Sequence, residues 1–288
     1  MQISAQLVKH SLSQESGVRL RTWLLEYPRI IHGELLTHRV FSKNSASSRA
    51  IPIDKVIAMV ETDPAEPVHW GANQAGMSAR VEVEDKEAAR RAWKEASLAA
   101  VEQARKLQSL GLHKQVVNRV LEPFQWMRVV LTGTEFENFW WLRDHPDADP
   151  TLQRLASLMH EIDKASKPNL LKEGEWHLPF VESSRVNGRQ VFKDGMQLAD
   201  ALKLSVSLCA QTSFRKQDDS LEKATDLYKR LVESEPCHSS PTEHQALCAT
   251  EGNLEGWTHM AANGSLWSGN LRGWVQYRQT IPNNAKYG

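Results

Sequence analysis

ELLTHRVFSKNSASSR, residues 34–49, is the stretch from which the fold of this chain can be approached. It follows an apolar run, residues 23–31, and interrupts the hydrophobic pattern with two arginines, one histidine and four serines. Its serine- and asparagine-rich part is typical of a turn, in which backbone N–H groups and hydroxyls are free to bind oxygen anions. Arginines, a histidine and hydroxyls in one loop favour a phosphate or nucleotide site over a metal site or a nucleophile relay. A solvated turn after a basic helix end is the alternative interpretation.

The residues on either side of residue 32 predict a strand followed by a short helix. Residues 18–24 alternate between apolar and polar, which is typical of a half-buried strand, and the turn at residues 13–17 predicts a second strand before it. If residues 32–40 are helical, Glu34 and His38 lie on one face together with Thr37, because positions three and four apart share a face.

The same stretch resembles the signature of a known family. The pattern H-R-x-x-S-x-N-x-x-S-x-R is similar to the signature of the flavin-dependent thymidylate synthases, the ThyX family. Three positions differ, because Thr37 stands in place of an arginine, Ser45 in place of an acidic residue and Ala50 in place of a tyrosine. The matching residues are His38, Arg39, Ser42, Asn44, Ser47 and Arg49.

Further segments resemble the same family, and their order is unusual. Residues 119–123 resemble an arginine followed by Leu-Pro, and residues 138–143 resemble a segment that ends in Leu-Arg. Thr132 and Thr134 stand where the family has an Asn-x-Arg that contacts flavin. Residues 237–244, CHSSPTEH, resemble the family's G-H-x-S-P-x-E-H, which normally precedes the signature but here follows it.

This order indicates a circular permutation of a single ThyX-like domain. Residues 1–163 are equivalent to the C-terminal part of the family and residues 193–288 to its N-terminal part, while residues 164–192 form a connector between the original ends. Such cuts are tolerated where chain ends lie close together at the surface, so we expect Met1 and Gly288 to be neighbours.

The permutation also makes two local predictions. Residues 238–244 should lie near residues 38–49, within one chain or across a subunit interface, because the flavin needs both segments. Residues 172–175 of the connector should form an exposed loop in which the chain can be reopened.

The rest of the chain predicts helices, one long loop and one strand, and therefore an α+β fold with a mixed or antiparallel sheet. Residues 62–80 are rich in Pro, Gly and Asn and predict the loop. Residues 271–277 predict a strand with Gln276 on its polar face, which either lines the site or forms an ordinary sheet edge. Apolar residues of helical period occupy residues 83–110, 147–165, 194–208 and 221–232.

Composition excludes several classes of function. The 35 Lys and Arg residues balance the 35 Asp and Glu residues, so no global positive field predicts binding to duplex nucleic acid. No apolar run reaches the length of a membrane span and the N-terminal residues lack the apolar core of a signal peptide, so we expect a cytoplasmic protein, in the host cytoplasm if a phage encodes it. The three cysteines form no CxxC pair, which suits a reducing compartment.

The resemblance implies an activity, cofactors and an assembly. Members of the family convert dUMP to dTMP by reductive methylation with FAD, NADPH and methylenetetrahydrofolate, and four chains build the active sites at their interfaces, so a homotetramer is expected. Arg143 would bind and polarise the uracil as the catalytic residue, and the nucleotide would also contact Glu34, Ser47, Arg49 and Arg119. The flavin would contact His38, Arg39, Asn44, Asn138, His238, Ser240 and Glu243.

Other interpretations remain open. One is a related modification, hydroxymethylation of dUMP or dCMP in a virus that modifies its DNA, and another is a non-catalytic homologue that binds a nucleotide or flavin. Cys237, His238, Glu243 and His244 are ligand types for zinc, but their spacing fits no standard site, so no metal is expected. A nucleophile pair of Cys237 with a neighbouring histidine is disfavoured, because sequence neighbours rarely meet in attack geometry.

Overall fold

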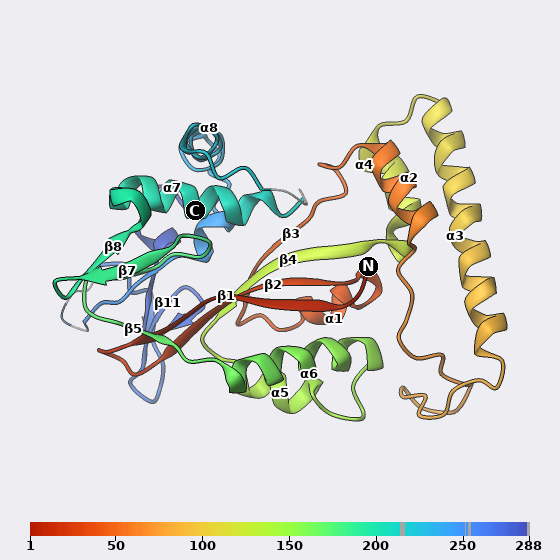
Figure 1. Ribbon diagram of the computed structural model, residues 1–288, viewed down its shortest axis with the longest axis horizontal. Coiled ribbons are helices and arrows are strands. Elements are labelled where there is room, and N and C mark those ends of the chain that lie inside the picture. The colour runs from red at the N-terminus through yellow and green to blue at the C-terminus, as the bar shows by residue number, and fades with distance from the viewer. Residues whose placement is uncertain (214–216, 251, 253–254, 287–288) are drawn as a thin grey trace.

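A five-stranded sheet forms the centre of the computed structural model, which describes residues 1–213, 217–250, 252 and 255–286 (Figure 1). The strand order is β3-β4-β2-β1-β5, and all neighbouring strands are antiparallel except β1 and β5. Together with the helices around it, this sheet confirms the predicted α+β class. The strands are β1 (Ser4–Ser13), β2 (Arg19–Pro28), β3 (Ser42–Ser45), β4 (Trp126–Gly133) and β5 (Asn169–Leu171).

β1 and β2 form the hairpin that the sequence predicts. Gly17 has a φ of +66° in its turn, where a glycine avoids the strain of a side chain, and the N–H of Ser13 donates to the carbonyl of Val18. β2 lies between β1 and β4, so residues on both of its faces are buried, and Trp23 and Leu25 are inaccessible to solvent.

Three helices contribute to the main core beside the sheet: α1 (His32–Leu36), α5 (Glu137–Arg143) and α6 (Pro150–Ala165). α6 begins at Asp149, whose carboxylate accepts hydrogen bonds from the N–H groups of Thr151 and Leu152 at 2.9 and 3.0 Å. Pro150 at the first helical position needs no such partner. The core includes Trp23, Leu25, Tyr27, Leu35, Leu131, Phe136, Phe139, Leu152, Leu155 and Met159.

A second group of helices lies at the far end of β4 and has its own apolar cluster (Figure 1). Its elements are α2 (Ile53–Thr62), α3 (Lys86–Ser109), α4 (Lys114–Val117) and the 3-10 helix η2 (Asn118–Phe124). α3 confirms the helix predicted from residues 83–110, and Asp85 caps it by accepting the N–H of Ala88 at 2.8 Å. The buried members of this cluster are Val56, Ile57, Val60, Val101, Ala104, Val117, Leu121 and Phe124.

The last third of the chain packs against the opposite part of the sheet (Figure 1). Here α7 (Leu198–Ala210) and α8 (Leu221–Leu231) confirm two more predicted helices, and the 3-10 helix η5 (Ser240–Glu243) follows them. One small sheet has the order β13-β9-β6, from Val275–Gln276, Ala246–Leu247 and Trp176–His177. Another has the order β10-β11-β12, from His259–Met260, Leu266–Ser268 and Leu271–Arg272. The remaining 3-10 helices are η1 (Arg29–Ile31), η3 (Lys193–Gly195), η4 (Gln211–Ser213) and η6 (Tyr277–Thr280).

Two predictions about local structure were wrong. The serine- and asparagine-rich part of the signature is not all turn, because residues 42–45 form β3 and pair with residues 129–132 of β4. Residues 271–277 do not form one strand, because Gly273, at a φ of +67°, separates β12 from β13, and these two strands belong to different sheets. Gln276 is accordingly buried rather than placed on a polar face.

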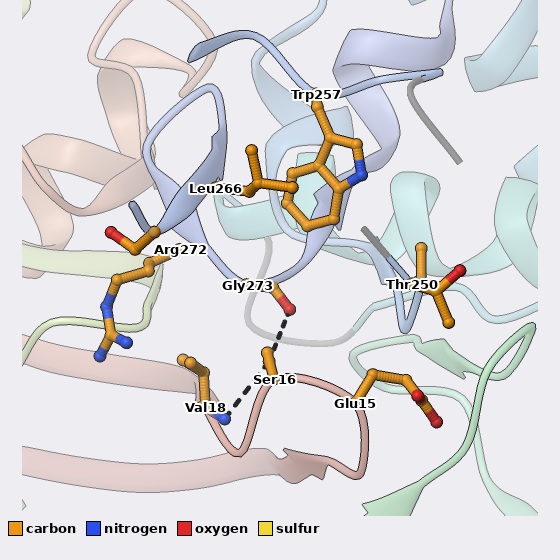
Figure 2. A pocket seen from close by; sticks show the side chains of 10 residues that line it. Glu15, Ser16, Val18, Thr250, Trp257, Leu266, Arg272 and Gly273 are labelled. Carbon is orange, nitrogen blue, oxygen red and sulfur yellow. Dashed lines mark hydrogen bonds between the residues drawn. The ribbon is translucent and has the colours of Figure 1, made fainter. Parts of the chain in front are cut away.

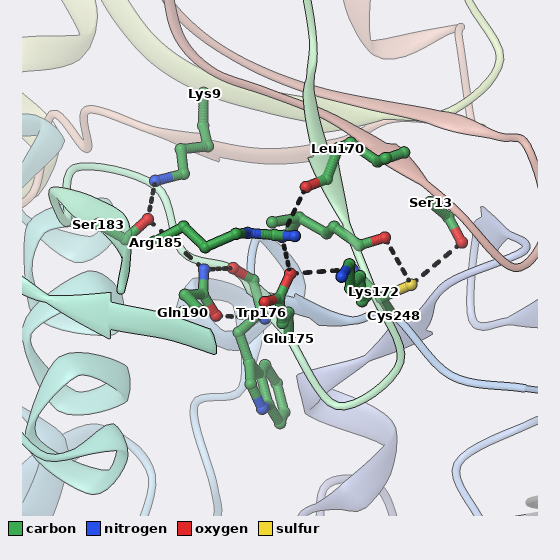
Figure 3. Close-up of polar contacts among 11 residues, drawn as sticks. Lys9, Ser13, Leu170, Lys172, Glu175, Trp176, Ser183, Arg185, Gln190 and Cys248 are labelled. Atoms are coloured by element: carbon green, nitrogen blue, oxygen red, sulfur yellow. Dashed lines mark hydrogen bonds and ion pairs between the residues drawn. The ribbon is translucent and has the colours of Figure 1, made fainter. Parts of the chain in front are cut away.

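The connector, residues 164–192, was also wrongly predicted to lack structure. It contains β5, β6 and the hairpin of β7 (Ser183–Val186) and β8 (Arg189–Phe192). Figure 3 shows its polar contacts: the buried carboxylate of Glu175 pairs with Arg185 and accepts the N–H of Lys172 at 2.9 Å. The side-chain amide of Gln190 bonds both the N–H and the carbonyl of Trp176 at 2.8 Å. Residues 172–175 are therefore held in place rather than forming a free loop.

The two chain ends can be compared only in part. Met1 pairs with Asp63 beside α2, whereas the carbonyl of Asn284 accepts hydrogen bonds from Ser239 and Arg278. Gly288 lies outside the described residues, so the predicted proximity of Met1 and Gly288 stays a prediction. Within the described part of the chain, no helix combines the length and apolar character needed to cross a membrane.

Candidate functional site

Arg143, at the C-terminal end of α5, contacts the face of α1 that the signature predicts. Its Nε donates to Nε2 of His38 at 2.9 Å, one terminal nitrogen donates to Glu34 Oε2 at 3.1 Å, and the other reaches Thr37 Oγ1 at 3.5 Å. Glu34, Thr37 and His38 therefore share one face, as predicted. We call these four residues the arginine cluster.

His38 is a neutral member of the arginine cluster. Burial lowers its pKa to about 4, and the positive charges of Arg143 and Lys43 act in the same direction. Its ring lies edge-on to Phe139 with centroids 5.0 Å apart. Because Nε2 accepts the hydrogen bond from Arg143, the single ring proton lies on Nδ1. His38 thus orients Arg143 without competing for an anion as a second cation would.

The arginine cluster borders a cavity of about 1050 Å³. Glu34 and Arg143 line one part of it, and the long loop predicted from residues 62–80 lines another. The loop is joined to the segment between α5 and α6 by Arg80, which pairs with Asp147 at 2.5 Å. The volume is at the upper end of the range for small-molecule sites, which leaves room for a nucleotide and a second planar molecule. Its other charged or titratable lining residues are His69, His145 and Asp149.

The segment 237–244 lies beside the signature, as predicted, because η5 packs against β3. Lys43 donates from Nζ to the carbonyl of His38 at 2.6 Å, and the carboxylate of Glu243 opposes the lowering of its pKa that burial causes. Glu243 itself pairs with Arg278. Charged groups from the two ends of the chain therefore continue the arginine cluster into one polar region.

The remaining predicted flavin contacts divide into exposed and internally bonded residues. Arg39, Asn138, His238 and Ser240 are exposed. Asn44 is half-buried, and its side-chain amide donates to the carbonyl of Cys209 at 2.6 Å. In this conformation the amide of Asn44 serves to join β3 to the end of α7.

The predicted phosphate contacts lie at the opposite end of β3 from His38. Ser47 and Arg49 are exposed on the turn that follows the strand. Arg119 pairs with Glu122 at 3.2 Å within η2, and Glu122 also pairs with Arg29 at 2.9 Å. Arg119 was expected beside Arg143, yet within one chain the two arginines have different partners.

Thr132 and Thr134, which replace the family's flavin contact, are both buried and bonded within the chain. The hydroxyl of Thr132 is 2.8 Å from the hydroxyl of Thr22 and 2.8 Å from Nδ1 of His244. The hydroxyl of Thr134 accepts the N–H of Arg272 at 3.1 Å. Neither hydroxyl is free for a cofactor in this arrangement.

Sequence reasoning missed three residues of this polar region. Lys43 lies inside the signature, and its charge and position were the available signal. Asn270 bonds Ser42 at 3.1 Å, and Gln276 bonds the same hydroxyl at 3.2 Å, but neither belongs to a recognisable motif.

The cysteine and zinc alternatives find no support in the described residues. Burial raises the pKa of Cys237 and of Cys209, so neither thiol is activated as a thiolate. Among the side chains that the structure describes, no group of three or more His, Cys, Asp or Glu is arranged to hold a metal ion.

A second cavity, of about 360 Å³, lies between the β1–β2 turn and the C-terminal segment (Figure 2). Trp257 and Leu266 stand on one side of it, and Ser16 donates to the carbonyl of Gly273 at 2.8 Å on the other. No residue of the arginine cluster and no predicted site residue lines this cavity.

Comparison with known proteins gives a partial structural likeness. No protein-family model matches the sequence. No curated protein matches it either. The solved structure of the UMP/dUMP methylase PolB from Streptomyces cacaoi bound with 5-Br dUMP is 17% identical, with a TM-score of 0.48, over 57% of this chain and 90% of that chain. The same protein bound with 5-Br UMP is also 17% identical, with a TM-score of 0.46, over 57% of this chain and 89% of that one.

Proposed function

We propose that this chain is a flavin-dependent enzyme of the ThyX type that methylates dUMP to dTMP. The observation that carries the proposal is the arginine cluster: segments that match three separate motifs, far apart in sequence, lie next to one another in space. FAD, NADPH and methylenetetrahydrofolate are proposed as cofactor and co-substrates on the strength of the motifs.

Arg143 would act on the pyrimidine ring. Bound flavin would supply the hydride in such a reaction, and methylenetetrahydrofolate the one-carbon unit. The task of the chain is to hold the ring and to stabilise negative charge on its oxygens, which a guanidinium in a site closed to water does well. Glu34 at 3.1 Å now occupies one terminal nitrogen of Arg143, so the uracil would compete with that carboxylate for the guanidinium.

The flavin fits these residues only in part within one chain. Exposed groups such as Arg39 and Ser240 are free of internal roles that would keep them from a cofactor. Asn44, Thr132 and Thr134 are already bonded inside the protein. We therefore infer that the cofactor is held mainly by the exposed groups and by groups from a neighbouring subunit.

A homotetramer would complete the site. Ser47 and Arg49 lie at the other end of β3 from His38 and Arg143, so one nucleotide would contact both sets more readily if two chains contributed. Large apolar side chains are exposed on the elements that carry the arginine cluster, which is typical of a surface that another subunit covers. They are Leu36, Val40, Trp141 and Leu142.

The first test is the visible spectrum of the purified protein after incubation with FAD, followed by product analysis from dUMP, NADPH and labelled methylenetetrahydrofolate. Replacing Arg143 with Gln should lower turnover by about a hundredfold or more, since it removes a charge-assisted contact to the developing negative charge. Replacing Arg91 with Gln on the exposed side of α3 is the control and should change nothing. A wild-type protein that takes up no flavin and forms no product would overturn the proposal.

The second candidate is hydroxymethylation of dUMP or dCMP. The internal bonding of Thr132 and Thr134 favours it, because a changed flavin contact is compatible with a changed second half-reaction. Mass spectrometry of the product separates the two, since the hydroxymethyl product carries one more oxygen than the methyl product. Flavin uptake without turnover of any of these nucleotides would instead identify a non-catalytic binding protein.

A further inference from the structure

Gln276, a residue that no motif singles out, links three separate segments of the chain. Its side chain is 1% exposed. Its amide nitrogen donates to Oδ1 of Asn270 at 2.8 Å, to the carbonyl of Glu243 at 3.1 Å and to the hydroxyl of Ser42 at 3.2 Å. One buried amide thus contacts the signature strand, the segment 237–244 and the C-terminal segment.

Asn270 completes this link. Its Oδ1 also accepts the hydroxyl hydrogen of Ser42 at 3.1 Å, and its amide nitrogen donates to the carbonyl of Val40 at 3.0 Å. We call Asn270 and Gln276 the amide clamp. Its partners Val40 and Ser42 flank the residues between His38 and Lys43, so the clamp fixes the loop that leads from the arginine cluster into β3.

The surroundings of Gln276 leave its amide little freedom. Gly269 has a φ of +59°, and a Cβ built there would lie 2.5 Å from Oε1 of Gln276. That oxygen also accepts a hydrogen bond from Gln279 at 3.2 Å. A buried amide that loses its partners costs about 1–3 kcal/mol, so the observed orientation is strongly favoured over one that abandons them.

The regular elements on their own hold the two segments of the polar region weakly. β3 has only four residues and pairs with β4 alone, and η5 is a single 3-10 turn. Ser42 and Glu243 lie in distant parts of the sequence, so the short covalent chain around each does not fix their separation. The hydrogen bonds of Gln276 join them directly.

We infer that the amide clamp holds the signature strand and η5 in register, so that Lys43 and Glu243 face each other next to the arginine cluster. Asn270 and Gln276 are positioning residues, because they touch Ser42 and the main chain rather than a reacting atom. The catalytic consequence rests on the proposed function, whereas the positioning itself does not.

Hydrogen exchange of the full chain without ligand tests the positioning. Replacing Gln276 with Met keeps the size and removes the donors, and replacing Gly269 with Ala displaces the amide by a clash. Either change should speed exchange of residues 40–46 and 238–246 about tenfold, the factor that corresponds to one net hydrogen bond. α6 should exchange as in the wild type. Replacing Gln190 with Met is the matched control, since it removes an amide that bonds main chain elsewhere.

Titration with dUMP and FAD tests the catalytic consequence. Both clamp variants should bind more weakly by about tenfold and raise KM more than they lower kcat, since Arg143 itself is unchanged. Exchange that rises equally in every helix would reveal a general loss of stability and overturn the inference, and so would unchanged exchange in both segments. A wild type that binds neither ligand refutes the proposed function, while the exchange result still decides the clamp.

Discussion

Mild acid should destabilise this protein, because two buried histidines are held neutral in its core. His244 and His177 are inaccessible to solvent. Nδ1 of His244 is 2.8 Å from the hydroxyl of Thr132, while the two ring nitrogens of His177 are 2.8 Å from Ser11 and 2.9 Å from Thr22. Burial lowers the pKa of His244 to about 3. Burial also lowers the pKa of His177 well below its usual value, and nearby Lys9 adds to the effect.

The sign and size of the effect follow from linkage. Between about pH 6.5 and pH 3 the unfolded chain protonates His244 while the folded chain does not, so protons favour unfolding. The stability that the neutral ring contributes is complete above pH 6.5 and is lost as the pH falls towards 3. Each such group costs about 1.4 kcal/mol per pH unit, so lowering the pH from 7 to 5 should cost about 2 kcal/mol for His244 and a similar amount for His177.

Urea unfolding at pH 7.5, 6.5 and 5.5 measures this slope. Replacing His244 with Gln should lower stability at pH 7.5, since the Thr132 contact changes, but should make the pH dependence shallower by about 1.4 kcal/mol per unit. Replacing His259 with Gln, on the exposed strand β10, is the control and should leave the slope as it is. A free energy of unfolding that stays constant from pH 7.5 to 5.5 would refute the reasoning.

Three further changes test the core. Asp163→Asn should lower the free energy of unfolding by about 3–5 kcal/mol, because the guanidinium of Arg21, 2.5 Å away and buried, loses its counter-charge, and thermal and urea unfolding would show it. Gly133→Ala should cost about 1–3 kcal/mol, since its Cβ would lie 2.6 Å from the ring of Phe41, and a wild-type melting temperature would contradict that. Leu152→Ala should cost about 2–5 kcal/mol through the cavity left in the main core, read from the urea midpoint at constant m-value.

The parts of the fold that could be predicted from the sequence are those that local chemistry specifies. The β1–β2 hairpin follows from a turn closed by Gly17 between alternating strands, and α3 follows from a long apolar stripe. In both cases the deciding residues are neighbours along the chain, so periodicity and turn chemistry suffice.

The parts that were missed depend on partners far away in the sequence. β3 is a strand of Ser, Lys, Asn and Ser, a composition that favours turns, and it is extended because β4 offers it a pairing edge. The connector strands β5 to β8 are two to four residues long and are set by side chains such as Glu175 and Gln190. No local pattern in residues 164–192 carries that information.

The candidate site shows the same division. Arg143, Glu34 and His38 were predicted together because a helical face and a motif agreed on them, and the structure brings them together. Gln276 could not be found in this way, since a buried amide leaves no spacing signature and its role appears only when its acceptors are placed around it.

The state of Arg143 explains why the chain needs both kinds of residue. Neutral His38 fixes its Nε, whereas the half-exposed carboxylate of Glu34 pairs with a terminal nitrogen and so offsets the charge that a substrate would meet. An ion pair with that much solvent access is worth about 0–1 kcal/mol, so an anionic ring oxygen can displace Glu34 at small cost while the bond to His38 persists. The guanidinium is therefore oriented before a ligand arrives, without being strongly neutralised. That orientation is useful only if the surrounding loop stays in register, which is the role assigned to the hydrogen bonds of Asn270 and Gln276.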